Sequence, residues 1–349
     1  MKNIKSYARE ELADLFEEWG QPRFRVQQIV KWLYQRGVTS YDEMTDMPKT
    51  LRARLAEQAP LNAPELLDKR ISRDGTRKYV WTFEDGKGVE TVAIPSRERN
   101  MNGEPQRLTV CFSTQVGCAM ECAFCATGKE GFSRNLTPGE MVDQILFSGK
   151  DMDMRVSNVV AMGQGEPFLN YDNTLAALRF INSKDGLHIG ARHITVSTCG
   201  VIPGIERFSQ EPEQFTLAVS LHSAVQDTRD QLMPKMKDMT LRRLKEALAS
   251  YSNLSGRRVS LEYLLLKGVN DDEQHLESLV AFCEGLLCHI NLLPFNTVED
   301  SPFQPSSKHQ RSLWLERLEQ ARIEATVRDS RGSDIEGACG QLKRAIHQA

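Results

Sequence analysis

Residues 118–125 read CAMECAFC and place Cys118, Cys122 and Cys125 in a C-x3-C-x2-C pattern. A structural zinc site usually needs four closed ligands, and no second C-x2-C pair lies near this one. A cubane iron–sulfur cluster held by three thiolates would leave one iron free to bind a substrate. Buried core thiols are another alternative, but Gly117 and Ala123 make this segment typical of a loop rather than of an apolar stripe. The spacing therefore favours an iron–sulfur cluster.

The cysteine pattern follows RLTVCFS, the first of several apolar runs that begin at about residue 105. The later runs are SNVVAMG, HITVST, FTLAVSLH, RVSLEYLLL, CHINLLPF and IEATVR, and amphipathic segments such as LRRLKEALASY separate most of them. Strands that alternate with helices predict a mainly parallel sheet with right-handed crossovers. One helix start is clear at TPGE, where Thr137 can cap the helix and Glu140 can complete a capping box.

The first hundred residues have a different pattern. Residues 7–19, 24–36 and 48–58 carry helical spacing, which predicts a small helical module. The runs KYVWTF and VETVAI lie near Asp74-Gly75 and Asp85-Gly86, and these dipeptides favour hairpin turns, so residues 66–95 are expected to form an antiparallel meander. We therefore divide the chain into a helical accessory domain (1–64), a β-hairpin extension (65–104) and an α/β domain (105–349).

Composition limits the classes of protein to consider. A net charge of −3 gives no general attraction to nucleic acid or to anionic membranes. No apolar run approaches the roughly 18 residues of a membrane span, and the opening residues lack the apolar segment of a secretory signal, so a cytoplasmic protein is expected. Eight cysteines in a reducing compartment indicate metal or redox chemistry rather than structural disulfides. Nothing such as a heptad seam argues for assembly, and a monomer is expected.

The segment GQGEP at residues 163–167 follows the second strand of the α/β region. A dinucleotide fingerprint would need a third glycine where Phe168 stands, and a Walker loop would need Lys followed by Ser or Thr. Two glycines let the backbone approach a ligand, and Glu166 offers a carboxylate for an ammonium group, although a plain tight turn is the alternative. Further polar residues end later strands, where ligands of such folds collect: Ser197, Ser220, His222 and Asn296.

A C-x3-C-x2-C motif after the first strand of such a domain resembles the radical S-adenosylmethionine (SAM) enzymes. Five segments are similar to the RlmN and Cfr adenosine methyltransferases: VETVAIP (89–95), CFSTQVGCAMECAFCATG (111–128), GQGEP (163–167), SLH (220–222) and GACGQL (337–342). FRVQQIVKWLYQRGVTSYDEMTDMP extends the likeness, which is closer to RlmN, over nearly the whole chain. The resemblance implies an α/β fold: a partial (β/α)6 radical SAM barrel, with a small N-terminal helical accessory domain and a short β meander.

The resemblance also implies the cofactors. Cys118, Cys122 and Cys125 would hold a 4Fe-4S cluster whose open iron binds SAM, with two SAM molecules used per turnover. The implied SAM contacts are Gly165, Glu166, Ser197, Ser220, Leu221, His222 and Asn296. A reductant such as flavodoxin or ferredoxin would supply the electron. Two departures from the family pattern are Gln164, where Met is usual, and Cys199, where Ser is usual.

Three further residues take catalytic roles by the same resemblance. Cys339 in GACGQL would carry the methyl group, and Cys111 would resolve the adduct through a transient disulfide. Glu90 would accept the proton of the base. Local sequence alone favours ordinary roles for two of them, because Cys111 fits a small hydrophobe in a buried strand and Glu90 fits a solvated strand position.

The implied activity is methylation of adenine carbon 2 in 23S ribosomal RNA, at the peptidyl transferase centre, and in tRNA next to the anticodon. Methylation of carbon 8, as in Cfr-like members, is an alternative. A non-catalytic RNA-binding protein with a structural metal is another. Composition adds little on RNA, because the basic cluster formed by Lys69, Arg70, Arg73, Arg77 and Lys78 fits a solvated face as well as a phosphate contact.

Overall fold

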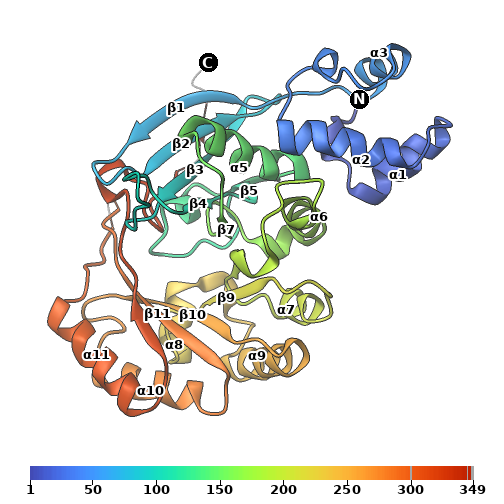
Figure 1. Ribbon diagram of the computed structural model, residues 1–349. Helices are drawn as coiled ribbons and strands as arrows, with labels where there is room; N and C mark the ends of the chain where they lie inside the picture. The colour runs from blue at the N-terminus through green and yellow to red at the C-terminus, as the bar shows by residue number, and fades with distance from the viewer. Residues whose placement is uncertain (299–300, 344, 347–349) are drawn as a thin grey trace.

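The N-terminal part of the protein is helical. The computed structural model describes residues 1–298, 301–343 and 345–346. The predicted helical segments are present in a module at the upper right of Figure 1. Its elements are η1 (Ile4–Ser6), α1 (Arg9–Glu18), α2 (Phe24–Val30), the π-helical turn η2 (Lys31–Arg36), η3 (Tyr41–Glu43) and α3 (Lys49–Gln58).

Three antiparallel strands follow the module and form one end of a large sheet. They are β1 (Glu65–Ile71), β2 (Arg77–Thr82) and β3 (Lys87–Pro95). The two expected turns are present, with Gly75 and Gly86 at φ of 83° and 72°, a conformation that glycine adopts without strain. The predicted meander is therefore confirmed. It is continuous with the rest of the sheet, because β3 pairs antiparallel with β4 (Leu108–Cys111).

From β4 onward the large sheet continues with parallel strands in the order β4-β7-β8-β9-β10-β11-β12, while β13 (Ala345–Ile346) pairs antiparallel with β3. Each of the parallel strands after β4 is formed by one of the predicted apolar runs: β7 (Asn158–Ala161), β8 (Ile194–Thr198), β9 (Thr216–Ser220), β10 (Val259–Leu265), β11 (Cys288–Pro294) and β12 (Ala325–Val327). The sheet does not close, so the architecture is a partial barrel (Figure 1). The predicted α/β fold is confirmed.

Helices connect the parallel strands and cover the sheet (Figure 1). The α-helices are α4 (Ala126–Lys129), α5 (Pro138–Met152), α6 (Tyr171–Asn182), α7 (Ile202–Phe208), α8 (Gln226–Leu232), α9 (Leu241–Ser255), α10 (Glu273–Cys283) and α11 (Lys308–Gln320). Short 3-10 turns are η4 (Pro167–Asn170), η5 (Ala191–His193), η6 (Pro234–Met236) and η7 (Ser333–Ile335). In the described part of the chain, none of the helices combines the length and apolar character that a membrane span requires.

A small hairpin encloses the cysteine segment and was not foreseen from the sequence. It pairs β5 (Gln115–Gly117) with β6 (Phe132–Asn135). Gly117 has φ of 75°, and a Cβ atom there would lie 1.9 Å from the Gly131 carbonyl oxygen. The amide of Cys118 donates to that same oxygen at 3.1 Å. Only glycine fits at residue 117, and the hairpin thereby fixes both ends of the cysteine loop.

One hydrophobic cluster extends from the N-terminal module into the sheet. Tyr34 of the module is fully buried and its ring lies 4.8 Å from that of Phe180 in α6. Strand residues such as Val110, Val196 and Ile290 belong to the same cluster. Because the module shares its core with the barrel, packing holds it in a defined position.

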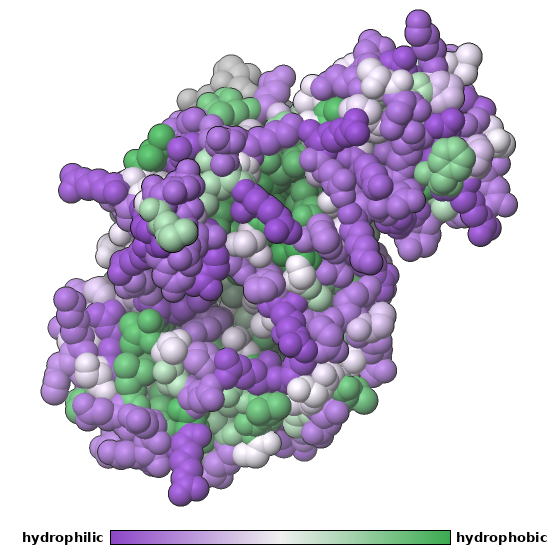
Figure 2. Space-filling model, viewed as in Figure 1, coloured by the Kyte–Doolittle hydropathy of each residue, from purple (hydrophilic) through white to green (hydrophobic). Residues whose placement is uncertain are grey.

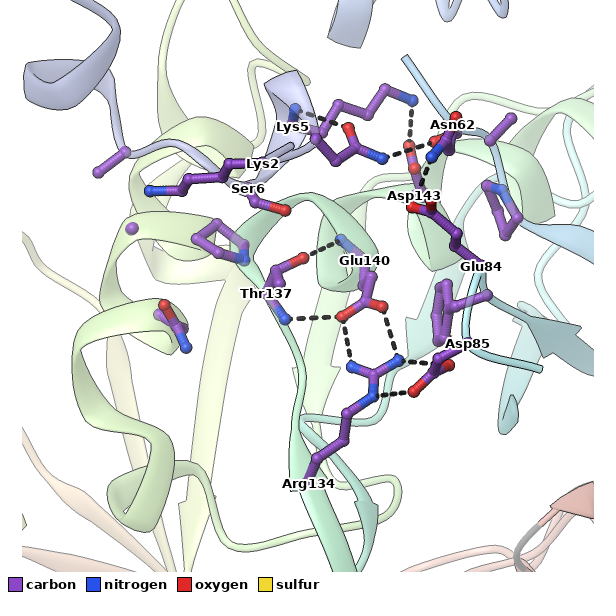
Figure 3. A pocket seen from close by; sticks show the side chains of 18 of the residues that line it. Lys2, Lys5, Ser6, Asn62, Glu84, Asp85, Arg134, Thr137, Glu140 and Asp143 are labelled. Atoms are coloured by element: carbon purple, nitrogen blue, oxygen red, sulfur yellow. Dashed lines mark hydrogen bonds and ion pairs between the residues drawn. The ribbon is translucent and has the colours of Figure 1, made fainter. Parts of the chain in front are cut away.

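Ion pairs add to the contact between the module and α5. Lys5 donates to the Asp143 carboxylate at 2.6 Å, and both side chains are almost completely buried (Figure 3).

The amide of Glu140 donates to the Thr137 hydroxyl at 3.3 Å, while the amide of Thr137 donates to the Glu140 carboxylate at 2.8 Å. This is the capping box predicted at TPGE, and it confirms the helix start.

Candidate active site

A cavity of about 170 Å3 lies at the carboxyl ends of the parallel strands. Hydrophilic residues cover most of the face shown in Figure 2, and hydrophobic residues are visible in a hollow near its centre and in smaller patches over the lower half. Many predicted site residues line the cavity: Cys118, Cys122, Cys125, Gly165, Glu166, Ser197, Ser220, His222 and Cys339. Cys111, Leu221, Asn296 and Glu90 do not. The fold thus brings together residues that are far apart in the chain, because parallel strands place their carboxyl ends at one edge.

The cysteine loop is held by backbone hydrogen bonds to two other segments. The amide of Ala123 donates to the carbonyl of Leu232 in α8, and the amide of Ala126 donates to the carbonyl of Gly340, both at 2.9 Å. A Cβ atom at Gly128 would lie 2.9 Å from the Cys122 amide nitrogen, so the turn after the loop needs a glycine. These contacts fix the loop between α8 and the segment that carries Cys339.

The three cysteines fit a cluster better than a single metal ion. All three thiols are free and line one cavity. Among the residues that the structure describes, no three His, Cys, Asp or Glu side chains converge closely enough to surround one ion. Each thiolate of a 4Fe-4S cluster binds a different iron, so its ligands stand apart around the cavity. This donor set therefore suits the predicted cluster, of which three irons would have a cysteine ligand.

Glu166 is fixed in the wall of the cavity. Its carboxylate accepts hydrogen bonds from the amides of Phe168 at 3.0 Å and of Cys199 at 2.7 Å. Burial raises the pKa of Glu166, although these hydrogen bonds lower it in part. Gly165 has φ of 100°, and a Cβ atom there would lie 2.6 Å from that of Gln115, so no larger residue fits. The segment forms a tight turn. It also presents a carboxylate that can bind a further donor, since the two oxygens of Glu166 can accept more hydrogen bonds than the two from Phe168 and Cys199.

His222 is buried at the end of β9 with a positive φ of 55°. Its Nδ1 atom accepts a hydrogen bond from the amide of Leu264 at 3.1 Å, which leaves the proton on Nε2. Burial, together with the charge of Arg229, lowers the pKa of His222 to about 3, so the ring is neutral. Leu221 is fully buried, and its amide donates to the Glu262 carbonyl, so its side chain lies in the core. Its predicted contact with SAM stays a prediction.

A second cavity of about 290 Å3 brings Cys111 and Cys339 together. Cys339 lines both cavities and is exposed, whereas Cys111 is 8% exposed at the end of β4. The amide group of Asn296 donates to the carbonyl of Cys339 at 3.3 Å. Burial raises the pKa of Cys111 strongly, and the neighbouring Cys339 adds to the effect. The two cysteines therefore line the same cavity. Cys111 is also a buried strand residue, as its local sequence predicted.

Glu90 is a buried, ion-paired residue rather than a solvated one. Its carboxylate lies 2.9 Å from the ammonium group of Lys78 and accepts from the amide of Lys343 at 2.7 Å. Burial raises the pKa of Glu90, and Lys78 partly opposes that rise. Glu90 precedes Val92 by two residues, and Val92 is the partner of Cys111 in the sheet. Glu90 and Cys111 thus share a face of the sheet, because alternate residues of a strand point to the same side.

Several residues of this region were not predicted from the sequence. Glu262 of β10 lines the first cavity, and its carboxylate accepts a hydrogen bond from Asn291 at 2.7 Å. The only sign of such a role in the sequence was the presence of one carboxylate within an apolar run. Cys199 already stood out in the sequence as a departure from the family pattern, and its sulfur lies 4.0 Å from that of Cys122. Arg229 of α8 is fully buried behind the cysteine loop. No local pattern marks Arg229, because a helix of seven residues carries little periodicity.

The basic cluster of β1 and β2 is largely ion-paired. Lys69 and Arg77 both contact Asp151, at 2.8 and 2.6 Å, and Lys78 pairs with Glu90. Arg70 pairs with Asp68 and Glu336, both at 3.2 Å. Four of the five cations of this cluster therefore have carboxylate partners, and the structure gives no added sign of a phosphate-binding patch there.

Comparison with known proteins identifies the family. Residues 2–61 match the family model of the ribosomal RNA large subunit methyltransferase N-terminal domain, and residues 112–280 match that of the radical SAM superfamily. A probable dual-specificity RNA methyltransferase RlmN from Clostridium novyi (strain NT) is 40% identical, over 99% of this chain and 98% of the relative. The corresponding protein of Thermoanaerobacter sp. (strain X514) is 43% identical, over 99% and 98%.

A solved structure agrees with the sequence relatives. The crystal structure of a radical SAM methyltransferase from Sphaerobacter thermophilus has a TM-score of 0.90 and 41% identity, covering 98% of this chain and 99% of that chain. Together with the partial barrel and the cavity lined by three cysteines, these matches place the chain in the class of radical SAM RNA methyltransferases. More narrowly, the chain belongs to the RlmN family of dual-specificity RNA methyltransferases. A 4Fe-4S cluster and SAM are the cofactors of this superfamily.

Proposed function

We propose that this enzyme methylates carbon 2 of one adenosine in 23S rRNA, at the peptidyl transferase centre, and of the adenosine 3′ to the anticodon in tRNAs. The observation that carries the proposal is the second cavity, which is lined by both Cys111 and Cys339. Cys339 also lines the first cavity, where the three cysteines of the C-x3-C-x2-C motif lie. A second pair of thiols has no use in simple methyl transfer from SAM. It suits a reaction in which one thiol carries the methyl group and the other releases the product.

Cys118, Cys122 and Cys125 would hold the 4Fe-4S cluster, which supplies the electron for reductive cleavage of SAM. The carboxylate of Glu166 suits the amino group of SAM, and Gly165 leaves room for close approach of the backbone. Ser197, Ser220 and His222 line the same cavity and would contact other parts of SAM. Asn296 reaches it less directly, through the Cys339 carbonyl. A reductant such as flavodoxin or ferredoxin would deliver the electron.

Cys339 would carry the methyl group as S-methylcysteine, because it opens to both cavities. One hydrogen atom would leave the S-methyl group for the adenosyl radical that reductive cleavage of SAM supplies, and the methylene carbon would then bond to carbon 2 of adenine. Glu90 would accept the proton of carbon 2 while one electron returns from the adduct to the cluster; burial makes Glu90 a stronger base than an exposed carboxylate. The Cys111 thiolate would then attack the Cys339 sulfur and form a disulfide, the bond between that sulfur and the methylene carbon would break, and the methylene group would take up a proton to become the methyl group of the released base. Two electrons from the reductant would restore both thiols. Glu90 lies outside both cavity walls in this structure, so its role requires the segment around Lys343 to move.

The accessory domain (1–64) would grip the shape of the RNA, the hairpin extension (65–104) would connect it to the barrel, and residues 105–349 would carry the chemistry. The target adenine must leave its stack to reach the cavity. A monomeric, cytoplasmic enzyme suffices for this scheme.

The test is nucleoside mass spectrometry of rRNA and tRNA from cells that lack the gene and have no paralogue. We expect 2-methyladenosine to disappear, to return with the wild-type gene and to stay absent with Cys339→Ser. Persistence of 2-methyladenosine in the deletion strain contradicts the proposal. A product methylated at carbon 8 supports the Cfr-like alternative, and one tightly bound zinc in place of iron supports a non-catalytic RNA-binding protein.

A further inference from the structure

Arg229 is a fully buried cation with an incomplete set of partners. It lies in α8, and its Nη2 atom donates to the carbonyl of Cys199 at 2.6 Å. Its Nε and Nη1 atoms are buried, and within residues 1–298, 301–343 and 345–346 they have no hydrogen-bond partner. Within the same residues no carboxylate lies at ion-pair distance from the guanidinium. A carbonyl oxygen alone does not neutralise this charge.

Buried charges in proteins are normally paired, because removal from water disfavours the charged form. The two lysines that are buried in the described part of the chain follow that rule. Lys5 lies 2.6 Å from Asp143, and Lys78 lies 2.9 Å from Glu90. Arginine does not lose its proton under ordinary conditions, so Arg229 cannot escape the cost by becoming neutral. Among the described residues, no carboxylate pairs directly with Arg229, and Asp230, the next residue of α8, contributes only an attraction over a longer distance.

The position of Arg229 indicates where that partner binds. The carbonyl of Leu232, three residues further along α8, accepts from Ala123 inside the cysteine loop at 2.9 Å. Cys199, which holds the guanidinium through its carbonyl, has its sulfur 4.0 Å from that of Cys122. A Cβ atom at Gly200 would lie 3.0 Å from Nη2, so a side chain there would crowd the guanidinium. The charge of Arg229 interacts with Cys199, Asp230 and Cys122, in that order of strength, and it also acts on His222.

We infer that Arg229 is the counter-charge of the iron–sulfur cluster and raises its reduction potential. Three thiolates around an oxidised 4Fe-4S core carry a net charge of about −1, which becomes about −2 on one-electron reduction. A fixed cation behind the ligand loop stabilises the reduced form more than the oxidised form. The inference rests on the proposed cluster and assigns to Arg229 a positioning and tuning role, since it lies outside the cavity wall.

The test compares Arg229→Met, Arg229→Gln and Arg229→Lys in the full chain, reconstituted anaerobically with iron and sulfide. The midpoint potential is measured by EPR-monitored redox titration. We expect Met and Gln to make reduction about tenfold less favourable, which is about 59 mV for one electron, and Lys to remain close to wild type. Arg243→Met is the matched control, because Arg243 is exposed on α9.

Thermal unfolding of the cluster-free protein separates this role from a structural one. An unpaired buried charge disfavours the apo fold, so Arg229→Met is expected to leave its Tm unchanged or higher, although the same change lowers the potential of the loaded protein. A loaded Met or Gln variant with the wild-type potential overturns the inference. A large fall in apo Tm, with Lys as damaging as Met, also overturns it. Wild-type protein without iron contradicts the proposed cofactor itself, and the inference falls with it.

Discussion

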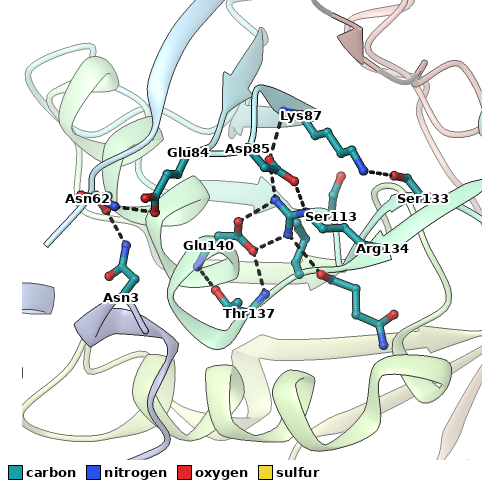
Figure 4. A network of polar contacts seen from close by, with 12 residues as sticks. Asn3, Asn62, Glu84, Asp85, Lys87, Ser113, Ser133, Arg134, Thr137 and Glu140 are labelled. Atoms are coloured by element: carbon teal, nitrogen blue, oxygen red, sulfur yellow. Dashed lines mark hydrogen bonds and ion pairs between the residues drawn. The ribbon is translucent and has the colours of Figure 1, made fainter. Parts of the chain in front are cut away.

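Two cavities of this protein differ in how their polar groups are used. The larger, about 690 Å3, lies between the N-terminal segment and α5, and its charges bond to one another. Arg134 contacts Asp85 and Glu140 together, at 2.6 and 2.8 Å, as Figure 4 shows. The smaller, about 170 Å3, contains free thiols, glycine backbone and a fixed carboxylate. The volume of a cavity therefore does not show where the chemistry takes place, because paired charges stabilise the structure whereas unpaired donors remain available for a ligand.

Replacement of Cys339 is expected to have the largest effect on activity. Cys339→Ser keeps the size of the side chain but removes the nucleophilic sulfur, so methylation of RNA should fall by several orders of magnitude. The measurement is product formation by mass spectrometry with an RNA substrate. The control is Cys283→Ser, because Cys283 is buried in α10 with the core. Iron content should stay at the wild-type value in the Cys339 variant, and substantial residual methylation would contradict its role as methyl carrier.

Removal of a cluster ligand should abolish the cofactor and leave the fold. Cys122→Ser takes one thiolate from the three, and iron is expected to fall from about four atoms per chain to below about one. Iron and sulfide analysis after anaerobic reconstitution measures this, with circular dichroism to check folding. The matched control Cys199→Ser has its sulfur beside Cys122 but is not a predicted ligand. Equal iron loss in both variants would show that Cys199 is also needed to hold the cluster.

The larger cavity should respond in the opposite way, with lost stability and kept chemistry. Lys5→Met leaves the buried Asp143 carboxylate without its partner, which is expected to destabilise the protein by about 3–5 kcal/mol. Urea unfolding of the cluster-free protein gives the value. The double variant Lys5→Met/Asp143→Leu should recover most of the loss, because apolar groups of similar size replace the pair. A folded Lys5→Met enzyme with no iron would contradict the separation between the two cavities.

The smallest effect is expected at Asp85, on the exposed rim of the larger cavity. Burial raises the pKa of Asp85, but hydrogen bonds from Arg134 and from the Lys87 amide outweigh burial and lower it. A lowered carboxyl pKa stabilises the folded state above the unfolded value of about 3.9, and that stability is lost as the pH falls through the folded pKa. Asp85→Asn should therefore cost about 0.2–1 kcal/mol at pH 7, and progressively less as the pH falls below about 3.9. Urea unfolding over a series of pH values tests the sign.

The local patterns of the chain predicted much of the fold and part of the site. The apolar runs gave the parallel strands, and TPGE gave the start of α5, because neighbouring residues make these contacts. The hairpin β5–β6 was missed, since strands of three and four residues are too short to show an alternating pattern. The local sequence predicted that Glu90 is exposed to solvent. In the structure Glu90 is buried, because the segment at Lys343 covers it.

The sequence by itself determined the cysteine loop, since a spacing of three and two residues places three thiols on one short loop whatever surrounds it. It also determined which segments become strands, through the apolar runs. Only the tertiary structure decided which distant groups meet: Cys111 with Cys339 in one cavity, and Arg229 behind the loop that carries Cys122. The physical reason is the distance along the chain over which each interaction acts. Capping and periodicity act between neighbours along the chain, whereas a shared cavity or an uncompensated buried charge exists only once the sheet has brought separate strands together.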